Sequence, residues 1–380
     1  MIGRKKFLAI ISATAFGLFL AGCFSRAGSI DFISKNSASS GGTAALGSET
    51  MQSANTSKET VQSSDTTKNS TEQSTRTSET VLGKKAYVGI AGSNDSIEYL
   101  VNKAIELAGG LGFIKSGSTV MLKPNFNTGN QNPASANPEV IRQVIRIVKK
   151  QNPLQIIVAD RSGFWLDTEK CMEQNGITNV ANEEGAELAA LEDLEWEKIT
   201  PKLALNWPKG FRIPKLLNAA DYVISIPVLK THSIANFSMA IKNWVGILFA
   251  KDRASDLHLF NSKEEIFGYK LAELHLARVP DFIIMDGSRA FVEGGPTEGK
   301  IIDSNLIVAS NDIVANDVTG LAVLKNLGTI KIIRDRNVWE HPQIIRAVQL
   351  GLGTKSSSGI VLNSEGIDYI NSIAVEIKNN

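Results

Sequence analysis

The sequence predicts an α/β fold, a mostly parallel sheet with helices on both faces in a Rossmann-like layering. Short apolar, β-branched runs recur along the second part of the chain, and helical patterns lie between them. Continuous apolar runs of this length are typical of strands buried on both faces of a parallel sheet. Their alternation with helices is typical of layered α/β folds.

The runs follow one another in a regular order. The predicted strands cover residues 86–90, 119–122, 155–159, 222–227, 281–285 and 305–309. The predicted helices cover residues 96–111, 138–150, 238–248, 263–278 and 312–327. Residues 183–215 give no clear pattern, and the tail is expected to add strands near Ile360 and Ile373.

The N-terminus carries the features of a bacterial lipoprotein signal. Arg4, Lys5 and Lys6 are basic, and the apolar run 7–20 that follows is shorter than the roughly 20 residues that span a bilayer. The run ends in a lipobox, Leu-Ala-Gly-Cys, at Cys23. We therefore predict that residues 1–22 are a signal peptide and that Cys23 is lipidated. Cys23 would anchor the protein to a bacterial membrane, on its extracytoplasmic side.

Residues 23–82 are predicted to be a disordered tether. Ser, Thr, Asn, Gln, Gly and Ala dominate this segment, which has too few large apolar residues to bury a core. A flexible linker of this length has a root-mean-square span of about 40 Å. The remaining residues, 83–380, are long enough for a large core and are predicted to form one globular domain.

Composition argues against several classes of partner and cofactor. The formal net charge is +1 and the charges are interspersed, so a nucleic-acid partner is not expected. Cys171 is the one cysteine left once Cys23 is acylated. An intrachain disulfide, an iron–sulfur cluster and a cysteine zinc site are therefore not expected.

Polar residues follow the predicted strands, at the place where open parallel sheets bind ligands. The second run ends at Lys123 and Asn125, the third at Asp160, and the fifth at Asp286. Loops after strands are normally polar, and Asp312 there is better explained as a helix cap. Lysine is a poor N-cap, so Lys123 needs another reason, such as a bound anion.

The segment 222–246 combines the largest number of such residues. Lys230 and His232 end its apolar run, and Lys242 and Asn243 follow. Ser238 and Lys242 are four residues apart and would share one face of the predicted helix. Apolar neighbours would bury Lys242 in part and lower its pKa unless an anion compensates. His232 is a general base, a metal ligand or a structural histidine by its type alone.

The loop 293–299 contains Gly294 and Gly295, whose backbone amides could surround an oxyanion or simply form a turn. The sequence contains no phosphate loop, dinucleotide fingerprint, nucleophile elbow or HExxH motif.

Several blocks, in order, resemble the bacterial and archaeal family called domain of unknown function 362. They are LKPNFN at 122–127, VADRSG at 158–163, LKTHSIANFSMAIKNWVG at 229–246, DFIIMDG at 281–287, EGGPTEG at 293–299 and LIVASNDIVANDVTG at 306–320. The resemblance implies no particular reaction. It points to Lys123, Asn125, Asp160, Lys230, His232, Lys242, Asn243, Asp286, Gly295 and Asp317. Some members carry a cysteine-rich ferredoxin-like segment, which this chain lacks.

We therefore predict a membrane-anchored enzyme that acts on a small anionic or polar substrate. The predicted catalytic residues are Lys123, Lys230, His232 and Lys242, with proton transfer by His232 and Asp160 or Asp286. The predicted substrate-binding residues are Asn125, Asn243, Gly294 and Gly295. Asp160, His232 and Asp286 are the candidate ligands of a divalent metal ion. The alternative is a tethered module that binds an anion, metabolite or metal without catalysis.

Overall fold

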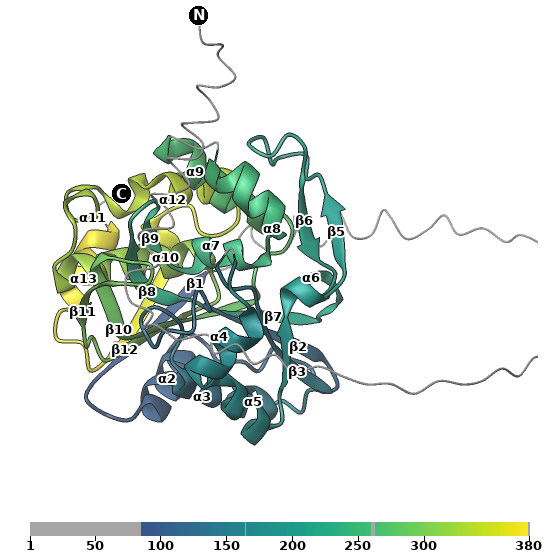
Figure 1. Ribbon diagram of the computed structural model, residues 1–380. Helices are drawn as coiled ribbons and strands as arrows, with labels where there is room; N and C mark the ends of the chain where they lie inside the picture. Colours follow the sequence, from purple (N-terminus) through teal and green to yellow (C-terminus); the bar gives the residue numbers. More distant parts are fainter. Residues whose placement is uncertain (1–84, 164, 260–262, 379–380) are drawn as a thin grey trace, which may run out of the picture. The chain divides into compact units, whose positions relative to one another are not determined.

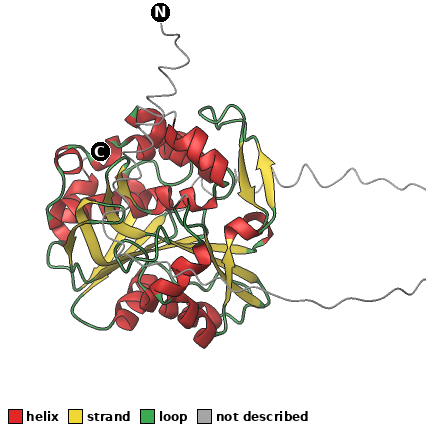
Figure 2. Ribbon diagram, viewed as in Figure 1, coloured by secondary structure: helices red, strands yellow, loops and turns green. Residues whose placement is uncertain are grey.

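The computed structural model describes residues 85–163, 165–259 and 263–378. The predicted signal peptide, Cys23 and the predicted tether lie outside the described residues. The described part of the chain forms an 11-stranded sheet with helices on both faces, and a separate two-stranded sheet (Figures 1 and 2).

Eight strands of the large sheet lie in the order β13-β1-β12-β10-β7-β2-β3-β4. They are β1 (Ala86–Gly92), β2 (Thr119–Pro124), β3 (Gln155–Asp160), β4 (Glu187–Ala190), β7 (Tyr222–Ile226), β10 (Phe282–Gly294), β12 (Leu306–Ser310) and β13 (Ile360–Glu365). The strands attached to this path are β8 (Val228–His232), β9 (Asn236–Ser238) and β11 (Gly299–Ile302); β5 (Trp196–Ile199) and β6 (Phe211–Pro214) form the small sheet.

Most of the sheet is parallel, as predicted. The strands from β10 through β7, β2 and β3 to β4 pair in parallel, and so do β1 and β13. β12 runs antiparallel to both of its neighbours, β1 and β10, which makes the sheet mixed. The carboxyl ends of β2, β3 and β7 consequently lie at one edge of the sheet.

The helices cover both faces of the sheet (Figure 1). The longer ones are α2 (Ile97–Leu107), α3 (Pro138–Lys149), α4 (Thr168–Asn175), α5 (Ile177–Glu184), α9 (Glu264–Glu273), α10 (Ile313–Leu327), α12 (Pro342–Gln349) and α13 (Ile370–Lys378). The shorter ones are α6 (Leu216–Ala219), α7 (Ala240–Asn243), α8 (Ala250–Asp252) and α11 (Lys331–Asp335). Single 3₁₀ turns and a π-helical segment, Arg253–Leu259, complete the described elements.

Successive side chains of each strand point to opposite faces of the sheet, which produces two separate cores. Val120 and Leu122 of β2 face one core, which α2, α3 and α5 complete, whereas Met121 faces the other. The second core contains residues of α9, α10, α12 and α13. Every residue of β2 after Thr119 is therefore buried, which explains the continuous apolar run that predicted this strand.

The structure corrects the prediction for residues 222–248. Pro227 separates two strands, β7 and β8, because proline has no amide hydrogen for the ladder. Lys230 therefore lies inside β8, which pairs with β10 and β9. The predicted helix 238–248 is also wrong at its start, since Ser238 belongs to β9 and α7 begins at Ala240.

Two other parts of the prediction need correction. The unclear segment 183–215 contains the end of α5, then β4, β5 and β6. The strand predicted near Ile360 is confirmed as β13, but Ile373 lies in helix α13. Apolar residues at helical spacing, Ile373 and Ile377, are the two buried positions of α13.

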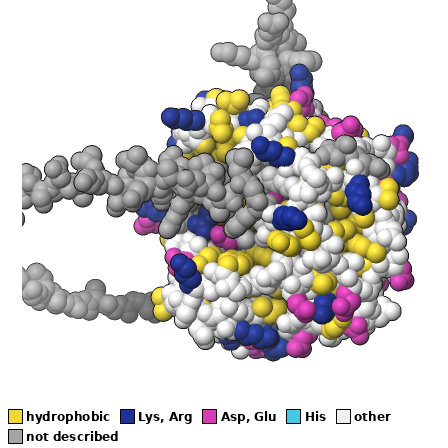
Figure 3. Space-filling view, turned by 180° about the vertical axis from the view of Figure 1, so that it is seen from behind, with side chains coloured by type: hydrophobic (Ala, Val, Ile, Leu, Met, Phe, Trp, Pro, Cys, Tyr) yellow, Lys and Arg dark blue, Asp and Glu magenta, His cyan; other side chains and the backbone are white. Residues whose placement is uncertain are grey.

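Charge on the molecular surface is mixed. On the face shown in Figure 3, basic and acidic side chains of the described residues are interspersed among apolar ones. Within the described ranges, none of the helices has the length and apolar character needed to cross a bilayer.

Candidate functional site

A polar pocket lies at the carboxyl ends of β2 and β3, the edge at which the sequence predicts a site. It is open to solvent at its mouth, and the room inside for the centre of a water-sized molecule is about 20 Å³, so in this conformation it admits one small group of a ligand. It is lined by Asn125, Phe126, Asn127, Asp160, Arg161, Lys230, Ser238, Lys242, Asn243, Val245, Gly246, Arg253 and Pro296.

A buried ion pair forms the floor of the pocket. Lys123, next to the last residue of β2, has no exposed surface, and its Nζ lies 2.6 Å from Oδ1 of Asp160 at the end of β3. The backbone N–H of Phe126 donates to the other carboxylate oxygen at 2.8 Å. Burial lowers the pKa of Lys123, and the Asp160 charge opposes this. Both charges are thus used within the protein, and Lys123 does not line the pocket.

Two asparagines extend this network. Oδ1 of Asn243 accepts from Lys123 Nζ and from Asn125 Nδ2, both at 3.4 Å. Its Nδ2 donates to the backbone oxygen of Lys123 and to Ser225 Oγ. Asn243 therefore fixes α7 to the ends of β2 and β7, and it contributes an amide to the pocket wall.

Lys230 has a mainly structural environment. Its buried Nζ donates to Asn125 Oδ1 at 2.8 Å and to the backbone oxygens of Ala134, Pro133 and Pro296 at 2.6–3.2 Å. Burial, assisted by the charge of Lys242, lowers the pKa of Lys230 well below its ordinary value, and the charges of Asp286 and Asp160 oppose this shift. The ammonium ties β8 to two loops.

Lys242 differs from both other lysines. Its side chain lines the pocket and is 9 % exposed, yet its Nζ has no hydrogen-bonding or ion-pair partner among the residues that the structure describes. Burial, assisted by the charge of Arg253, lowers the pKa of Lys242 to about 7. Near neutral pH, a substantial fraction of this amine is therefore uncharged.

The helix that carries Lys242 is held by a buried carboxylate. Asp317 of α10 accepts the backbone N–H groups of Ala240 and Ile241 at 2.7 and 3.0 Å, which satisfies the start of α7. Burial raises the pKa of Asp317 to about 7, although these two hydrogen bonds oppose the shift. Asp317 is thus a positioning residue for Lys242.

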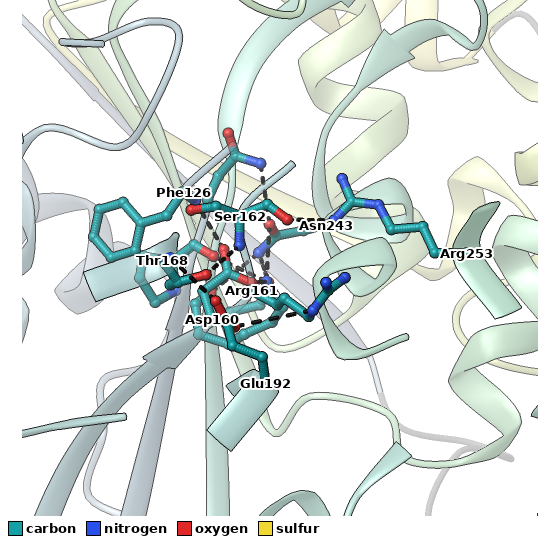
Figure 4. A network of polar contacts seen from close by, with 12 residues as sticks. Phe126, Asp160, Arg161, Ser162, Thr168, Glu192, Asn243 and Arg253 are labelled. Carbon is teal, nitrogen blue, oxygen red and sulfur yellow. Dashed lines mark hydrogen bonds and ion pairs between the residues drawn. The ribbon is translucent and has the colours of Figure 1, made fainter. Parts of the chain in front are cut away.

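Two arginines in the pocket were not selected from the sequence. Figure 4 shows their guanidinium groups on the same side of the network around Asp160. Arg253 donates from Nη1 to the backbone oxygen of Ser162 at 2.8 Å, and burial beside Arg161 lowers its pKa to about 10. Arg161 lies 3.9 Å from Glu192, but its Nη1 is buried without a hydrogen-bonding partner in the described structure. The VADRSG block contains Arg161, whereas no motif indicated Arg253.

His232 is not among the pocket-lining residues. Its Nδ1 accepts the backbone N–H groups of Ile234 and Ala235 at 3.1 and 3.3 Å, which places the ring proton on Nε2. Burial and the charge of Lys242 hold the pKa of His232 well below its usual value. Of the alternatives for His232, these contacts fit the structural histidine best.

The glycine loop also has a structural environment. Gly294 and Gly295 form the turn between β10 and β11, with positive φ angles of 82° and 72°. A Cβ at Gly295 would lie 2.1 Å from the backbone oxygen of Thr231, so close approach to β8 requires glycine there. Neither glycine lines the pocket, although Pro296 does.

The predicted metal ligands are not brought together. Asp160 forms an ion pair with Lys123, and His232 accepts hydrogen bonds from the backbone of the turn that follows it. Asp286 accepts from Asn132 Nδ2, the Asn137 N–H and the Ser288 N–H and hydroxyl at 2.7–3.1 Å. In the described ranges there is no group of three His, Cys, Asp or Glu residues that could hold a metal ion. In this structure the three predicted ligands are each held by other groups, so the metal site stays a prediction without support from their contacts.

Replacing Lys242 with methionine is expected to stabilise the fold at neutral pH by about 1–3 kcal/mol, because it removes a buried cation without a partner. The pKa of Lys242 is about 7 in the folded state and 10.5 as the ordinary value, so folding disfavours the charged form. The difference between variant and wild type is therefore complete below about pH 7 and closes as the pH rises towards 10.5. Urea unfolding at several pH values measures this difference in the free energy of unfolding.

The control is Lys251→Met, at an exposed position. Equal stabilities of Lys242→Met and wild type at pH 6 would contradict the expectation.

Comparison with known proteins agrees with the resemblance seen in the sequence. The model of the family described as domain of unknown function 362 matches residues 120–322, more than half of the chain. The chain belongs to this family. The matched residues run from β2 into α10, so all pocket-lining residues of this domain of unknown function 362 member lie within the match.

A curated relative and two solved structures are similar to this family member. A thylakoid-associated protein of Synechocystis is 30% identical over 277 residues, which cover 65% of this chain and 84% of the relative. The lactate racemase apoprotein of Thermoanaerobacterium thermosaccharolyticum has a TM-score of 0.39 and 13% identity, over 75% of this chain and 85% of that one. A Thermotoga maritima protein has a TM-score of 0.36 and 12% identity, over 57% and 54%. Structural likeness this distant says nothing about the chemistry of the pocket.

Proposed function

We propose that this protein is a membrane-anchored, extracytoplasmic lipoprotein whose α/β domain is an enzyme that acts on a small anionic substrate in the pocket. The observation that carries the proposal is the pairing, in one pocket, of an unpartnered amine, Lys242, with an unpartnered guanidinium nitrogen, Nη1 of Arg161. Nη1 of Arg161 is buried, and since buried polar groups are normally satisfied, this nitrogen points to a ligand.

The balance of charges supports an anionic ligand. Asp160 is the one carboxylate among the described residues that line the pocket, and Lys123 neutralises it. Lys230, Lys242, Arg161 and Arg253 also line the pocket, and all four are basic. An anion bound here would interact with these groups at low local dielectric, where electrostatic stabilisation is strong.

Among the predicted catalytic residues, Lys242 alone keeps that role. Lys123 and Lys230 hold the pocket together through their own hydrogen bonds, and His232 binds its turn. An amine with a lowered pKa can take up a proton from a substrate or attack it as a nucleophile. The proposed reaction therefore depends on the Lys242 amine and on the arginines that orient the substrate.

The membrane part of the proposal rests on the lipobox at Cys23 and on the relative whose name describes it as thylakoid-associated. A Cys23→Ala variant is expected to leave the membrane fraction and to lose incorporation of labelled palmitate. Sodium carbonate washing distinguishes anchoring from loose adsorption. A variant that stays in the washed membranes at the wild-type level would contradict lipid anchoring.

Anion binding tests the pocket directly. Oxalate and inorganic phosphate are expected to raise the melting temperature of the wild type, since a ligand of the folded state stabilises it. Arg161→Gln removes a charged donor, which is worth about 1.5–3 kcal/mol, so binding should weaken at least tenfold. Lys251→Met is the control for general loss of positive charge. Binding that is unchanged in Arg161→Gln would contradict the proposed site.

A module that binds anions without catalysis is the second candidate. It is favoured by the state of Asp160, whose two carboxylate oxygens are both occupied, so this carboxylate is not available as a base. Bound metabolites from cell extract distinguish the two functions when they are recovered after incubation and identified by mass. Conversion that Lys242→Met abolishes supports the enzyme, and recovery unchanged supports the binding module.

A further inference from the structure

The three lysines at the pocket, Lys123, Lys230 and Lys242, differ in their contacts. Lys123 contacts a carboxylate and two other oxygens, and Lys230 contacts four oxygens. Both environments suit an ammonium ion, which has three donors. Lys242 has neither a carboxylate nor an oxygen acceptor among the described residues, although it lines the same pocket. The fold therefore supplies two paired cations and one amine that is left for a ligand.

The surroundings of Lys242 favour a nucleophile over a simple electrostatic anchor. An anchor gains most when its charge is maintained, usually by a nearby carboxylate. Here the neighbouring charge is the cation Arg253, and Asp160 is already paired with Lys123. Cationic neighbours and burial are the two means by which proteins keep a reactive lysine uncharged. The anchoring role falls to Arg161, whose guanidinium remains charged at any physiological pH.

We propose that Lys242 forms an imine with the carbonyl carbon of an oxo acid whose carboxylate is bound by Arg161. This rests on the proposed function, because it assigns the substrate class of the same anion site. A planar guanidinium with a free Nη1 suits a carboxylate, which can accept two parallel hydrogen bonds from it. Lys242 lines the same pocket as Arg161, so its amine is the group available to a carbonyl next to that carboxylate.

The step balances without an oxidant or a metal. Nζ of Lys242 attacks the carbonyl carbon, and the electrons of the C=O π bond move to oxygen. A proton passes from nitrogen to that oxygen through solvent, which the open mouth of the pocket admits. The hydroxyl then takes a second proton from solvent, the C–O bond breaks as water leaves, and the nitrogen lone pair forms the C=N bond of a protonated imine. The protonated imine can withdraw electrons from the neighbouring carbon, which activates its bonds.

Reductive trapping tests the inference. The wild-type protein is incubated at pH 7 with glyoxylate, pyruvate or α-ketoglutarate and sodium cyanoborohydride, and its intact mass and peptides are measured. We expect one adduct, on Lys242, equal in mass to the oxo acid less one oxygen atom. Labelling should fall at least tenfold in Arg161→Gln and disappear from this position in Lys242→Met. Lys251→Met should label as the wild type does.

Two matched small molecules complete the experiment. Acetone shares the methyl ketone of pyruvate but lacks its carboxylate, so it should label at least tenfold less. Lactate has the carboxylate without the carbonyl, and it should compete with pyruvate. Lactate binding without an adduct from any of the three oxo acids would overturn the imine and leave the anion site standing. Equal labelling of Lys242→Met and wild type would also overturn it, since the adduct would then lie on surface lysines.

The reactivity of Lys242 provides a second measurement that needs no substrate. Trinitrobenzenesulfonate labels uncharged amines, and peptide mapping gives the rate at Lys242 separately. The rate is expected to rise with a midpoint near pH 7, whereas exposed Lys251 should follow an ordinary lysine. A midpoint at Lys242 equal to that at Lys251 would contradict a nucleophilic role at neutral pH.

Discussion

Replacing Asp160 with asparagine is expected to destabilise the protein by about 3–5 kcal/mol, because it leaves the Lys123 ammonium buried without its counterion. The pair is deeply buried, with side chains 0% and 3% exposed. The remaining partners of Lys123 Nζ are the backbone oxygen of Pro124 and the more distant Asn243 Oδ1. Neutral oxygens at 3.0 and 3.4 Å compensate a buried cation less well than a carboxylate does.

Urea unfolding of four proteins measures this expectation: wild type, Asp160→Asn, Lys123→Met and the double variant. The double variant should recover much of the loss, because removing both charges leaves no uncompensated ion. Glu195→Gln is the control, since its partner Lys215 is also exposed and such pairs contribute about 0–1 kcal/mol. A stability of Asp160→Asn within 1 kcal/mol of the wild type would contradict the structural role of the pair.

Much of the fold was predictable because it depends on short-range patterns. Runs buried on both faces, such as Val120 to Leu122, are apolar throughout and identify central strands. Pro138 after the cap Asn137 similarly marks the start of α3. The reversed direction of β12 could not be predicted, since this strand is as buried and as apolar as the parallel strands of the same sheet.

The region of the site was also predictable, but the roles of its residues were not. Polar residues at strand ends indicated Asn125 and Asp160, and the predicted helix 238–248 indicated Asn243; all three line the pocket. Whether a lysine is paired or free depends on oxygens far away in the chain. Lys230 is surrounded by oxygens of residues 125, 133, 134 and 296, and no local pattern shows that.

Arg253 shows the same limit of prediction from local sequence patterns. Arg253 lies in a π-helical segment, where a charged residue in the sequence suggests an exposed loop. Its guanidinium reaches the Ser162 carbonyl across 91 residues of chain. Only the packing of that segment over the strand ends makes Arg253 part of the pocket, and packing of this kind is not encoded in spacing.

The pocket lies where two buried structures meet, the ion pair at the strand ends and the short helical segment after Lys242. Gly246 is the point of contact between them. Its hydrogen-only side chain lets the 3₁₀ turn Trp244–Ile247 lie directly against Asp160. The separation of Lys242 from the floor of the pocket therefore depends on a residue that has no functional group of its own.

Changing Gly246 to alanine is accordingly expected to cost about 3 kcal/mol or more and to abolish anion binding in the protein that remains folded. A Cβ at this position would lie 2.0 Å from Asp160 Oδ1 and 2.7 Å from Lys123 Nζ. To make room for the Cβ, either the ion pair or the turn must move. The ion pair cannot move without losing its contact, and the turn is fixed from its other side by fully buried Trp244. Movement of either one displaces Lys242, four residues earlier in the chain.

Gly112→Ala is the matched control, because a Cβ there would meet no atom within 4 Å and the backbone does not require glycine. It should leave both stability and oxalate binding unchanged. Urea unfolding and thermal-shift titration with oxalate distinguish the two effects of Gly246→Ala, provided that binding is measured well below the melting temperature of the variant. Wild-type binding in a destabilised Gly246→Ala protein would show that the turn holds the fold without setting the position of Lys242. Wild-type stability would show that the ion pair and the turn can move apart, and that the floor of the pocket is less rigid than its contacts indicate.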